Sequence, residues 1–213
     1  SLINGTQVST ALAIKACLDG DILLKSADIA GAFSVENSFS SRKVFNKKIH
    51  QLKCHPGQKI SAQNVYKMLI GSEIVRSHSN CGKVQDPYSF RCIPHIHGAC
   101  RDTFSSAKTI INNEINSVSD NPLIMDKNTA MSSGHFHGEH ISQSLDMLSI
   151  AFTELGAISE RRTHYFMKGV KDLIPPFVAK NPGLESGYMI AHVTATALAS
   201  ENKTLSHPAS IDS

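Results

Sequence analysis

The stretch of the sequence richest in chemistry-bearing side chains runs from Gln85 to Arg91. Pro87 disfavours helix at Asp86, so a turn there would present Gln85, Tyr88 and Arg91 ahead of the next helix. Tyr88 and Arg91 are three residues apart and would share one face of a helical turn. A guanidinium fork suits a carboxylate, and a phenol can donate or accept a proton. The stretch therefore predicts a site for a substrate with a carboxylate and an exchangeable proton. The structural alternative is an N-cap at Asp86, a core Tyr88 and a surface ion pair for Arg91.

A second dense stretch is rich in histidine. It contains His135, His137 and His140 beside Glu139. A His-x-His pair is typical of metal sites, and a ligand set could be completed by His95 and His97. The neighbouring glycines instead indicate a loop that enters a helix, with the acid in the first turn where it suits the helix dipole. We favour hydrogen-bonded structure or substrate contacts here, and expect no metal.

Two further polar positions lie at expected helix ends. Asn4 precedes a helical segment, and its amide could cap that helix or face a ligand. Asp120 and Asn121 follow another helix, where their side chains are expected to satisfy loop backbone groups.

Helical periodicity dominates the segments that must position these residues, and alternating strand patterns are nearly absent. One apolar stripe consists of Ile141, Leu145, Leu148, Phe152 and Leu155, and a second of Phe104, Ala107, Ile111, Ile115 and Val118. Further helices are expected over 8–24, over 62–70 with Ser61 as N-cap, and over 186–205. Breaks are expected at 54–59, 86–87, 119–122 and 173–182. We expect an all-α bundle of long, mostly antiparallel helices with irregular loops, forming one segment over 1–213.

Composition excludes several classes of protein. The 213 residues are 41% apolar and carry a formal net charge of +3, with dispersed Lys and Arg, which argues against nucleic-acid binding. No apolar run reaches the roughly 18 residues of a membrane span, and no signal peptide is visible. The chain starts at Ser1 without an initiator Met, so we expect its natural N-terminus to be missing. The five cysteines lack C-x-x-C spacing, which favours reduced thiols and the cytoplasm.

Many short motifs follow one another in the order of a known family. They are L-I-N-G-T-Q-V-S-T-A, H-P-G-Q, G-S-E-I, V-Q-D-P-Y-S-F-R-C, N-S-V-S-D-N-P-L, S-G-H-F-H-G-E, S-E-R-R, S-G-Y-M and A-S-E-N-K-T-L-S-H-P-A-S-I-D-S. Over essentially the whole chain this order resembles the aromatic amino acid ammonia-lyase and aminomutase family. Q-D-P-Y-S-F-R-C and H-P-A-S-I-D-S are more similar to the members that act on histidine than to those that act on Phe or Tyr.

The resemblance implies an activity and a prosthetic group. Members of the family eliminate ammonia from an aromatic amino acid with a methylidene-imidazolone electrophile, which forms from an internal Ala-Ser-Gly. Such a group acts as an electron sink. The histidine-specific members convert L-histidine into urocanate at the start of histidine degradation. The resemblance also implies a homotetramer whose active sites combine residues of different subunits.

The matching motifs also imply roles for five residues. Asn4 would contact the electrophile and the amino-acid end of the substrate. Gln85 and Phe136 would lie near the electrophile. Tyr88 would be a catalytic tyrosine, and Arg91 would bind the substrate carboxylate.

The chain departs from the family pattern in ways that lead to further expectations. It contains no Ala-Ser-Gly, and the family's electrophile, loop tyrosine and substrate-contacting histidine would all precede Ser1. A downstream glutamate of the family would follow Ser213. His135 stands where the family usually has Asn, and His95 where it usually has Gln. We therefore expect a middle segment of a longer lyase that is inactive alone. The alternatives are a Phe or Tyr lyase or aminomutase, a helical scaffold without catalysis, and a histidine-cluster metal binder.

Overall fold

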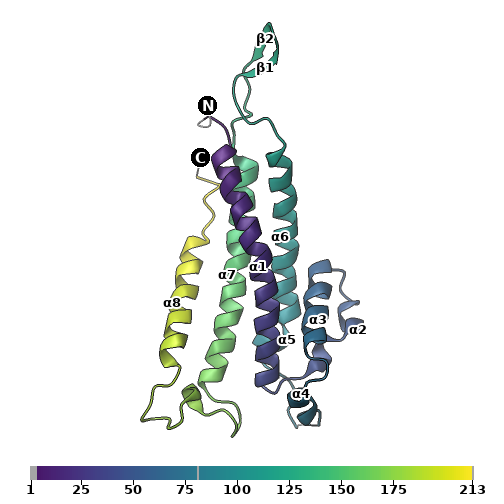
Figure 1. Ribbon diagram of the computed structural model, residues 1–213, viewed down its shortest axis with the longest axis vertical. Helices are drawn as coiled ribbons and strands as arrows, with labels where there is room; N and C mark the ends of the chain where they lie inside the picture. Colours follow the sequence, from purple (N-terminus) through teal and green to yellow (C-terminus); the bar gives the residue numbers. More distant parts are fainter. Residues whose placement is uncertain (1–3, 81, 213) are drawn as a thin grey trace.

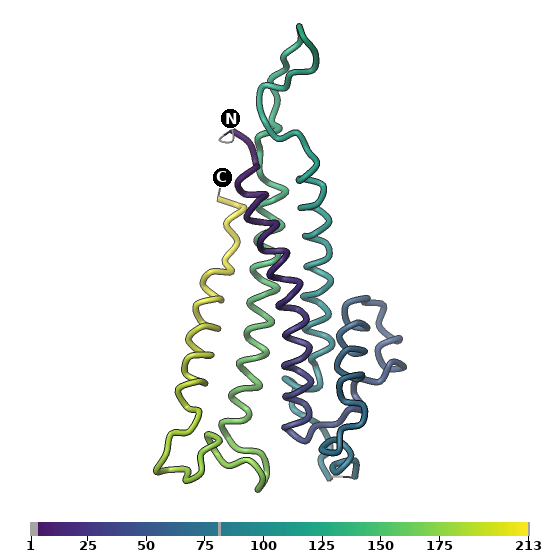
Figure 2. Tube along the Cα trace, viewed as in Figure 1, coloured from purple at the N-terminus to yellow at the C-terminus, as the bar shows by residue number. Residues whose placement is uncertain are grey.

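Four long helices lying side by side form the body of the molecule (Figure 1). The computed structural model describes residues 4–80 and 82–212. The long helices are α1 (Gln7–Asn37), α6 (Ile93–Ile115), α7 (Glu139–Met167) and α8 (Met189–Leu205). Each runs opposite to the one before it, which places both ends of the chain at the same end of the bundle (Figure 2). The expected all-α bundle of mostly antiparallel helices is confirmed.

The remaining elements are short and lie at the two ends of the bundle. They are η1 (Arg42–Phe45), α2 (Lys47–His50), α3 (Pro56–Met68), α4 (Glu73–Ser77), α5 (Tyr88–Arg91), β1 (Leu123–Asp126), β2 (Thr129–Met131) and η2 (Pro176–Val178). The helices between α1 and α6 gather beside the start of α6, whereas the β1–β2 hairpin projects beyond its end (Figure 1). The bundle therefore has a small-helix end and a hairpin end.

The hairpin is a β-structure that the sequence did not predict. Its strands are antiparallel, with Leu123 opposite Met131. The carboxylate of Asp126 accepts a hydrogen bond of 2.8 Å from the backbone N–H of Asn128, which closes the turn. Such a side-chain turn leaves little trace in hydrophobic periodicity, because all three residues of β2 are exposed.

The core lies between α1, α6 and α7. Ile141, Leu148 and Leu155 of α7 are buried there, and Leu145 and Phe152 pack against them, so this predicted stripe is confirmed. The stripe of α6 is confirmed from Phe104 to Ile111. Its last two predicted members are wrong: Ile115 is exposed at the end of α6, and Val118 is an exposed loop residue.

Helix α1 extends well past the predicted end at residue 24. The same buried spacing continues through Asp28, Gly31, Ala32 and Val35, so the helix gains packing over its whole length. The apolar spacing of the sequence does not indicate this continuation, because one of its buried positions is the carboxylate of Asp28. At the other end of the chain, α8 begins at Met189, three residues later than predicted.

The predicted start of α3 is also wrong. The helix begins at Pro56, with His55 as its N-cap, so the predicted break covers only the residues before Pro56. Proline suits the first helical turn, where its missing N–H is not needed. Ser61 is not a cap but a fully buried residue inside α3, whose hydroxyl accepts a hydrogen bond from Nε of Arg101.

Two glycines allow α3 and α6 to approach each other closely. A Cβ at Gly98 would lie 2.4 Å from the backbone N and Cα of Gln58. A Cβ at Gly57 would lie 2.3 Å from the carbonyl oxygen of Gly98. The backbones are therefore in contact, and any side chain at these positions would separate the helices.

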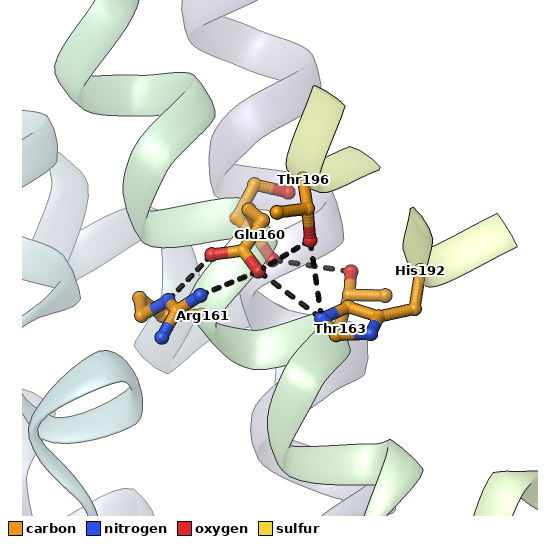
Figure 3. A network of polar contacts seen from close by, with 6 residues as sticks. Glu160, Arg161, Thr163, His192 and Thr196 are labelled. Atoms are coloured by element: carbon orange, nitrogen blue, oxygen red, sulfur yellow. Dashed lines mark hydrogen bonds and ion pairs between the residues drawn. The ribbon is translucent and has the colours of Figure 1, made fainter. Parts of the chain in front are cut away.

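Polar contacts hold α8 on α7, and one buried carboxylate is at their centre (Figure 3). Glu160 of α7 is 6% exposed and accepts hydrogen bonds from Arg161 of its own helix and from Thr196 of α8. Nε2 of His192, also on α8, lies 3.1 Å from the same carboxylate. The hydrogen bond from Arg161 is the main reason that the pKa of Glu160 is below its usual value, so Glu160 is charged. None of the described residues of α8 is buried, and its apolar face is open.

Two general properties follow from the described part of the chain. No helix within residues 4–80 and 82–212 is both long enough and apolar enough to cross a membrane. Cys17, Cys54, Cys92 and Cys100 are free thiols, whereas Cys81 lies outside the described residues.

The contact between α3 and α6 makes a direct prediction. Gly98→Ala should lower the free energy of unfolding by about 1–3 kcal/mol, because the added methyl group has no room between the two backbones. Urea unfolding followed by circular dichroism measures the change. Gly82→Ala is the matched control, since a Cβ there meets no atom within 4 Å. Equal stability of the two variants would contradict the close approach.

Candidate functional site

The predicted turn at Tyr88 and Arg91 is a single helical turn, α5, placed directly before α6. Pro87 is its N-cap, and Cys92 separates it from the first residue of α6. Phe90 is fully buried and anchors the turn, with its ring centroid 4.9 Å from that of Tyr165 on α7. Phe90 thus anchors the turn in the core, whereas Tyr88 on the same turn is exposed and Arg91 is half-buried.

Tyr88 and Arg91 lie against each other, as their spacing predicts. The guanidinium carbon of Arg91 is 4.5 Å from the centroid of the Tyr88 ring, which is cation–π contact. Tyr88 is 73% exposed, so the alternative of a core tyrosine is wrong. Arg91 is half-buried and forms no ion pair with a carboxylate of the described chain, so the alternative of a surface ion pair is also wrong. Its Nε–H is buried and has no acceptor among the described residues.

Asp86 fixes the loop that precedes this turn. It does not cap α5. Its carboxylate instead accepts a 2.8 Å hydrogen bond from the backbone N–H of Ser41 and lies 3.2 Å from the ammonium group of Lys83. Gln85, one residue earlier, is exposed. The loop is therefore tied to the segment after α1, while the side chain of Gln85 is open to solvent.

Asn4 and Phe136 meet at the hairpin end of the bundle. Together with Gly5 and Asn121 they line a shallow hollow of about 390 Å³. Asn4 does not cap α1, whose N-cap is Thr6. Asn121 was predicted as a structural residue, and its side-chain oxygen does accept a hydrogen bond of 2.7 Å from the backbone N–H of Ser133. It also lines the hollow, which the sequence reasoning missed; its place in the N-S-V-S-D-N-P-L motif was the available signal.

Close contacts with the end of α6 hold Asn4 in place. A Cβ at Gly5 would lie 2.1 Å from the carbonyl oxygen of Ser119, so only glycine fits there. The hydroxyl of Thr6 donates a 2.6 Å hydrogen bond to Glu114. These contacts explain why an Asn-Gly-Thr sequence opens the first helix: the two small residues let the chain lie on the loop after α6.

The five predicted site residues form two groups at opposite ends of the molecule. Gln85, Tyr88 and Arg91 come before the first turn of α6, whereas Asn4 and Phe136 lie beyond its last turn (Figure 1). The 23 residues of α6 span about 35 Å. One chain therefore does not bring the two groups together.

The histidines do not form a common cluster either. His97 is fully buried, and its Nδ1 lies 2.9 Å from the carboxylate of Asp28. His135 and His137 are exposed near the hairpin, at the far end of α6. Among residues 4–80 and 82–212, no three His, Cys, Asp or Glu side chains are placed to hold a metal ion. A ligand set that combines these histidines is therefore wrong.

Asp28 is the centre of a buried polar network beside the first turns of α6. It also accepts hydrogen bonds of 2.7 Å from Arg101 and 2.8 Å from Asn64. Burial alone would raise the pKa of Asp28, but the hydrogen bonds from His97 and Asn64 and the charge of Arg101 outweigh it and keep this pKa low. Burial lowers the pKa of His97, and the hydrogen bond to Asp28 only partly opposes it. A neutral His97 thus donates through Nδ1 to a charged Asp28.

Comparisons with known proteins bear on these arrangements. A family model described as aromatic amino acid lyase matches residues 1–213. The chain belongs to the aromatic amino acid lyase family. It is 45% identical to a histidine ammonia-lyase of Myxococcus xanthus over 214 residues, which cover 100% of this chain and 42% of that protein. The chain therefore spans about two fifths of the length of that relative.

Solved structures of the family have the same fold. A crystal structure of histidine ammonia-lyase from Trypanosoma cruzi is similar with a TM-score of 0.87 and 39% identity, over 100% of this chain and 39% of that one. A tyrosine aminomutase from Streptomyces globisporus is similar with a TM-score of 0.89 and 31% identity, over 100% and 44% of the two chains. The helical bundle is thus shared by lyases and aminomutases.

The network around Asp28 predicts a pH-dependent stability. Because the pKa of His97 is lowered in the folded state, the unfolded chain binds more protons once the pH falls below about 6.5. The free energy of unfolding should therefore fall as the pH decreases from 7.5 to 5.5, by at most about 1.4 kcal/mol per pH unit from this one group.

Urea unfolding at both pH values tests this expectation. His97→Gln, which keeps an N–H donor for Asp28, should reduce the loss of stability at low pH. His137→Gln, at an exposed loop position, should leave it unchanged. An unchanged pH dependence in His97→Gln would show that the buried imidazole is not responsible.

Proposed function

We propose that this chain is the helical core of an ammonia-lyase that acts on L-histidine. The observation that carries the proposal is the pairing of Tyr88 and Arg91, an exposed phenol beneath a guanidinium that has no carboxylate partner in the described chain. The reaction breaks the bond between Cα and the amino nitrogen, removes one proton from Cβ, and gives urocanate and ammonium. It would open the degradation of histidine. The 45% identity to a histidine ammonia-lyase supports this choice of substrate.

Four of the predicted site residues of this chain have a role in the proposed reaction. The fork of Arg91 suits the planar carboxylate of an amino acid and would fix its orientation by two parallel hydrogen bonds. Tyr88, in contact with that fork, is placed to move a proton at the amino group or at Cβ. Gln85 adds an uncharged hydrogen-bonding group at the mouth of the site. Asn4, which belongs to the group of site residues at the hairpin end, would hold the amino-acid end of the substrate.

The family's methylidene-imidazolone group fits the hollow at the hairpin end. The amide of Asn4 can donate to a carbonyl oxygen, and the ring of Phe136 offers a flat apolar surface beside it. When bound, the group supplies an electron sink for the elimination. Asn4 and Phe136 would hold it from one side, and Gln85 of another copy of the chain would contact it from the other. The chain has no Ala-Ser-Gly, so the group must come from a sequence outside these 213 residues.

We further propose that the active site is formed by more than one copy of the chain. The two groups of site residues are separated by the length of α6, so Asn4 and Phe136 of one copy would meet Tyr88 and Arg91 of another. The outward face of α1 supports association, since Leu12, Ile22 and Phe33 are each more than 60% exposed.

We assign a homotetramer, as in the family resemblance, and a cytoplasmic location, which the free thiols of the described cysteines support. On this proposal the isolated chain is inactive.

An aminomutase or lyase acting on tyrosine or phenylalanine is the second candidate. The TM-score of 0.89 to a tyrosine aminomutase favours it as strongly as the fold alone can. Two products are measured with L-histidine, L-tyrosine and L-phenylalanine as substrates of the complete protein that carries this chain: ammonia, which a lyase releases, and the β-amino acid, which an aminomutase forms without net ammonia release. Ammonia release from histidine alone supports the first candidate, and ammonia release or β-amino acid formation from tyrosine or phenylalanine alone overturns it.

Substitutions at the pair test the assigned roles. Tyr88→Phe should lower kcat by about 10²–10⁴, because it removes the proton-transferring hydroxyl and keeps the ring beneath Arg91. Arg91→Lys should raise KM by roughly 10-fold to 100-fold, because a single ammonium cannot replace the bidentate fork. Steady-state urocanate formation by the complete protein measures both.

Tyr165→Phe is the control for Tyr88→Phe. It also removes one phenolic hydroxyl, but at a ring that packs against Phe90 in the core. It should keep kcat within about twofold, since side chains away from the reacting atoms contribute little to the chemical step. Equal losses in the two variants would indicate a structural effect at Tyr88 and count against catalysis by it.

Mixing two inactive variants tests the shared site. Asn4→Ala removes a side chain from the hairpin-end group of site residues, and Tyr88→Phe removes a hydroxyl from the other group. An oligomer built from either variant alone should therefore be inactive. Co-expression in equal amounts should restore about one quarter of the sites, because each site then draws Asn4 and Tyr88 from different copies at random. Activity measured per tetramer gives the answer. A site within a single copy would give no recovery.

A further inference from the structure

A second hollow, separate from the proposed active-site residues, lies at the small-helix end. It has a volume of about 410 Å³ and lies between η1, the end of α3 and α4. We call it the basic hollow and define it by Ser41, Arg42, Lys43, Tyr66, Ser72 and Arg76. Three of these side chains are cations, and none of the described residues that line the hollow is acidic. The walls therefore favour an anionic occupant.

Arg42 is held in place without losing its charge. Its Nη1 donates a 3.1 Å hydrogen bond to the carbonyl oxygen of Leu69, and its guanidinium carbon lies 4.9 Å from the centroid of the Tyr66 ring. Neither partner is a carboxylate. An arginine that is oriented by a backbone carbonyl and an aromatic ring keeps its remaining N–H groups and its full charge for a ligand.

The other two cations are also available. Lys43 takes part in none of the ion pairs of the described chain. Arg76 lies 3.5 Å from Glu73, and both side chains are more than 70% exposed, so this pair is weak. The hydroxyl oxygen of Ser41 accepts from the N–H of Lys43, which leaves its proton free to donate. Three positive charges and a hydroxyl donor thus line the hollow, from η1 and the residue before it on one side and from α4 on the other.

Nearby carboxylates do not neutralise this cluster. The carboxylate of Asp86 already accepts a hydrogen bond from the backbone N–H of Ser41 and forms an ion pair with Lys83. Glu36 accepts a hydrogen bond of 2.5 Å from the hydroxyl of Ser72, at the edge of the hollow. The ammonium of a further cation, Lys171, lies 5.8 Å from the centroid of the Phe39 ring, which packs at a tilt against the ring of His78 in the wall. The positive charge therefore remains in excess around the cavity.

We propose that the basic hollow binds the phosphate group of a small molecule. A phosphate carries close to two negative charges and several acceptor oxygens, which matches three cations and a hydroxyl better than a single planar carboxylate would. The volume exceeds what one phosphate needs, and Tyr66 and Val75 would contact the rest of a phosphate monoester. The site does not depend on the ammonia-lyase activity, so either proposal can fail without the other.

Titration calorimetry on the complete protein that carries this chain tests the proposal. Inorganic phosphate and a phosphate monoester, glycerol phosphate, are titrated separately at constant ionic strength set with chloride. Saturable binding of one anion per chain is expected. Tighter binding of glycerol phosphate would identify the ligand as an organic phosphate, and tighter binding of inorganic phosphate would identify it as the free ion. Arg76→Gln and Arg42→Gln should each weaken binding by about tenfold or more.

Lys127→Gln is the matched control, since it removes one positive charge from the exposed turn of the hairpin, far from the hollow. It should leave the affinity within about twofold, because charges beyond the Debye length are screened. Arg76 is exposed, so its variant should fold even if Arg42→Gln does not. Absence of saturable binding, or binding that Arg76→Gln leaves unchanged, would overturn the proposal.

Discussion

The buried carboxylate of Asp28 is the constraint on which the small-helix end of the structure depends. It lies on α1, is 2% exposed, and receives donors from Asn64 on α3 and from His97 and Arg101 on α6. A carboxylate removed from water needs such partners, because an unpaired buried charge is strongly destabilising. The three helices are thereby held in one register. Since α5 comes directly before α6, this register also sets where Tyr88 and Arg91 point.

Sequence reasoning predicted the parts of the fold that follow from local spacing. The apolar stripe of α7 predicted its buried face, and the three-residue spacing of Tyr88 and Arg91 predicted their contact. Asp28 shows why the end of α1 was missed, since a buried charge interrupts an apolar pattern but not the helix. Ser61 shows the converse: it has the side chain of a good N-cap, yet the close contact of α3 with α6 buries it inside the helix.

The spacing of the motifs alone could not show how far apart the candidate site residues lie within one chain, although the family resemblance implied active sites shared between subunits. The motifs that contain Asn4, Tyr88 and Phe136 follow one another along the chain. Their order indicates that all three residues belong to a site, but it does not show how far apart they lie in the folded chain. Only the path of α6 shows that Tyr88 is separated from Asn4 and Phe136 by about 35 Å. Local patterns predict which residues meet within a turn or two, whereas the distance between turns depends on the tertiary fold.

The two faces of α1 also carry a consequence for how the protein is made. One face is buried against α6 and α7, and the other exposes residues such as Leu12 and Phe33 that are as apolar as the core. In the assembly proposed above, a newly folded copy exposes this apolar surface until it meets another copy. The productive encounter is second order in chain concentration, and so is non-specific aggregation through the same surface. At low expression the proposed assembly would thus be limited by the encounter between chains, and the exposed face of α1 is the surface that a chaperone would cover in the meantime.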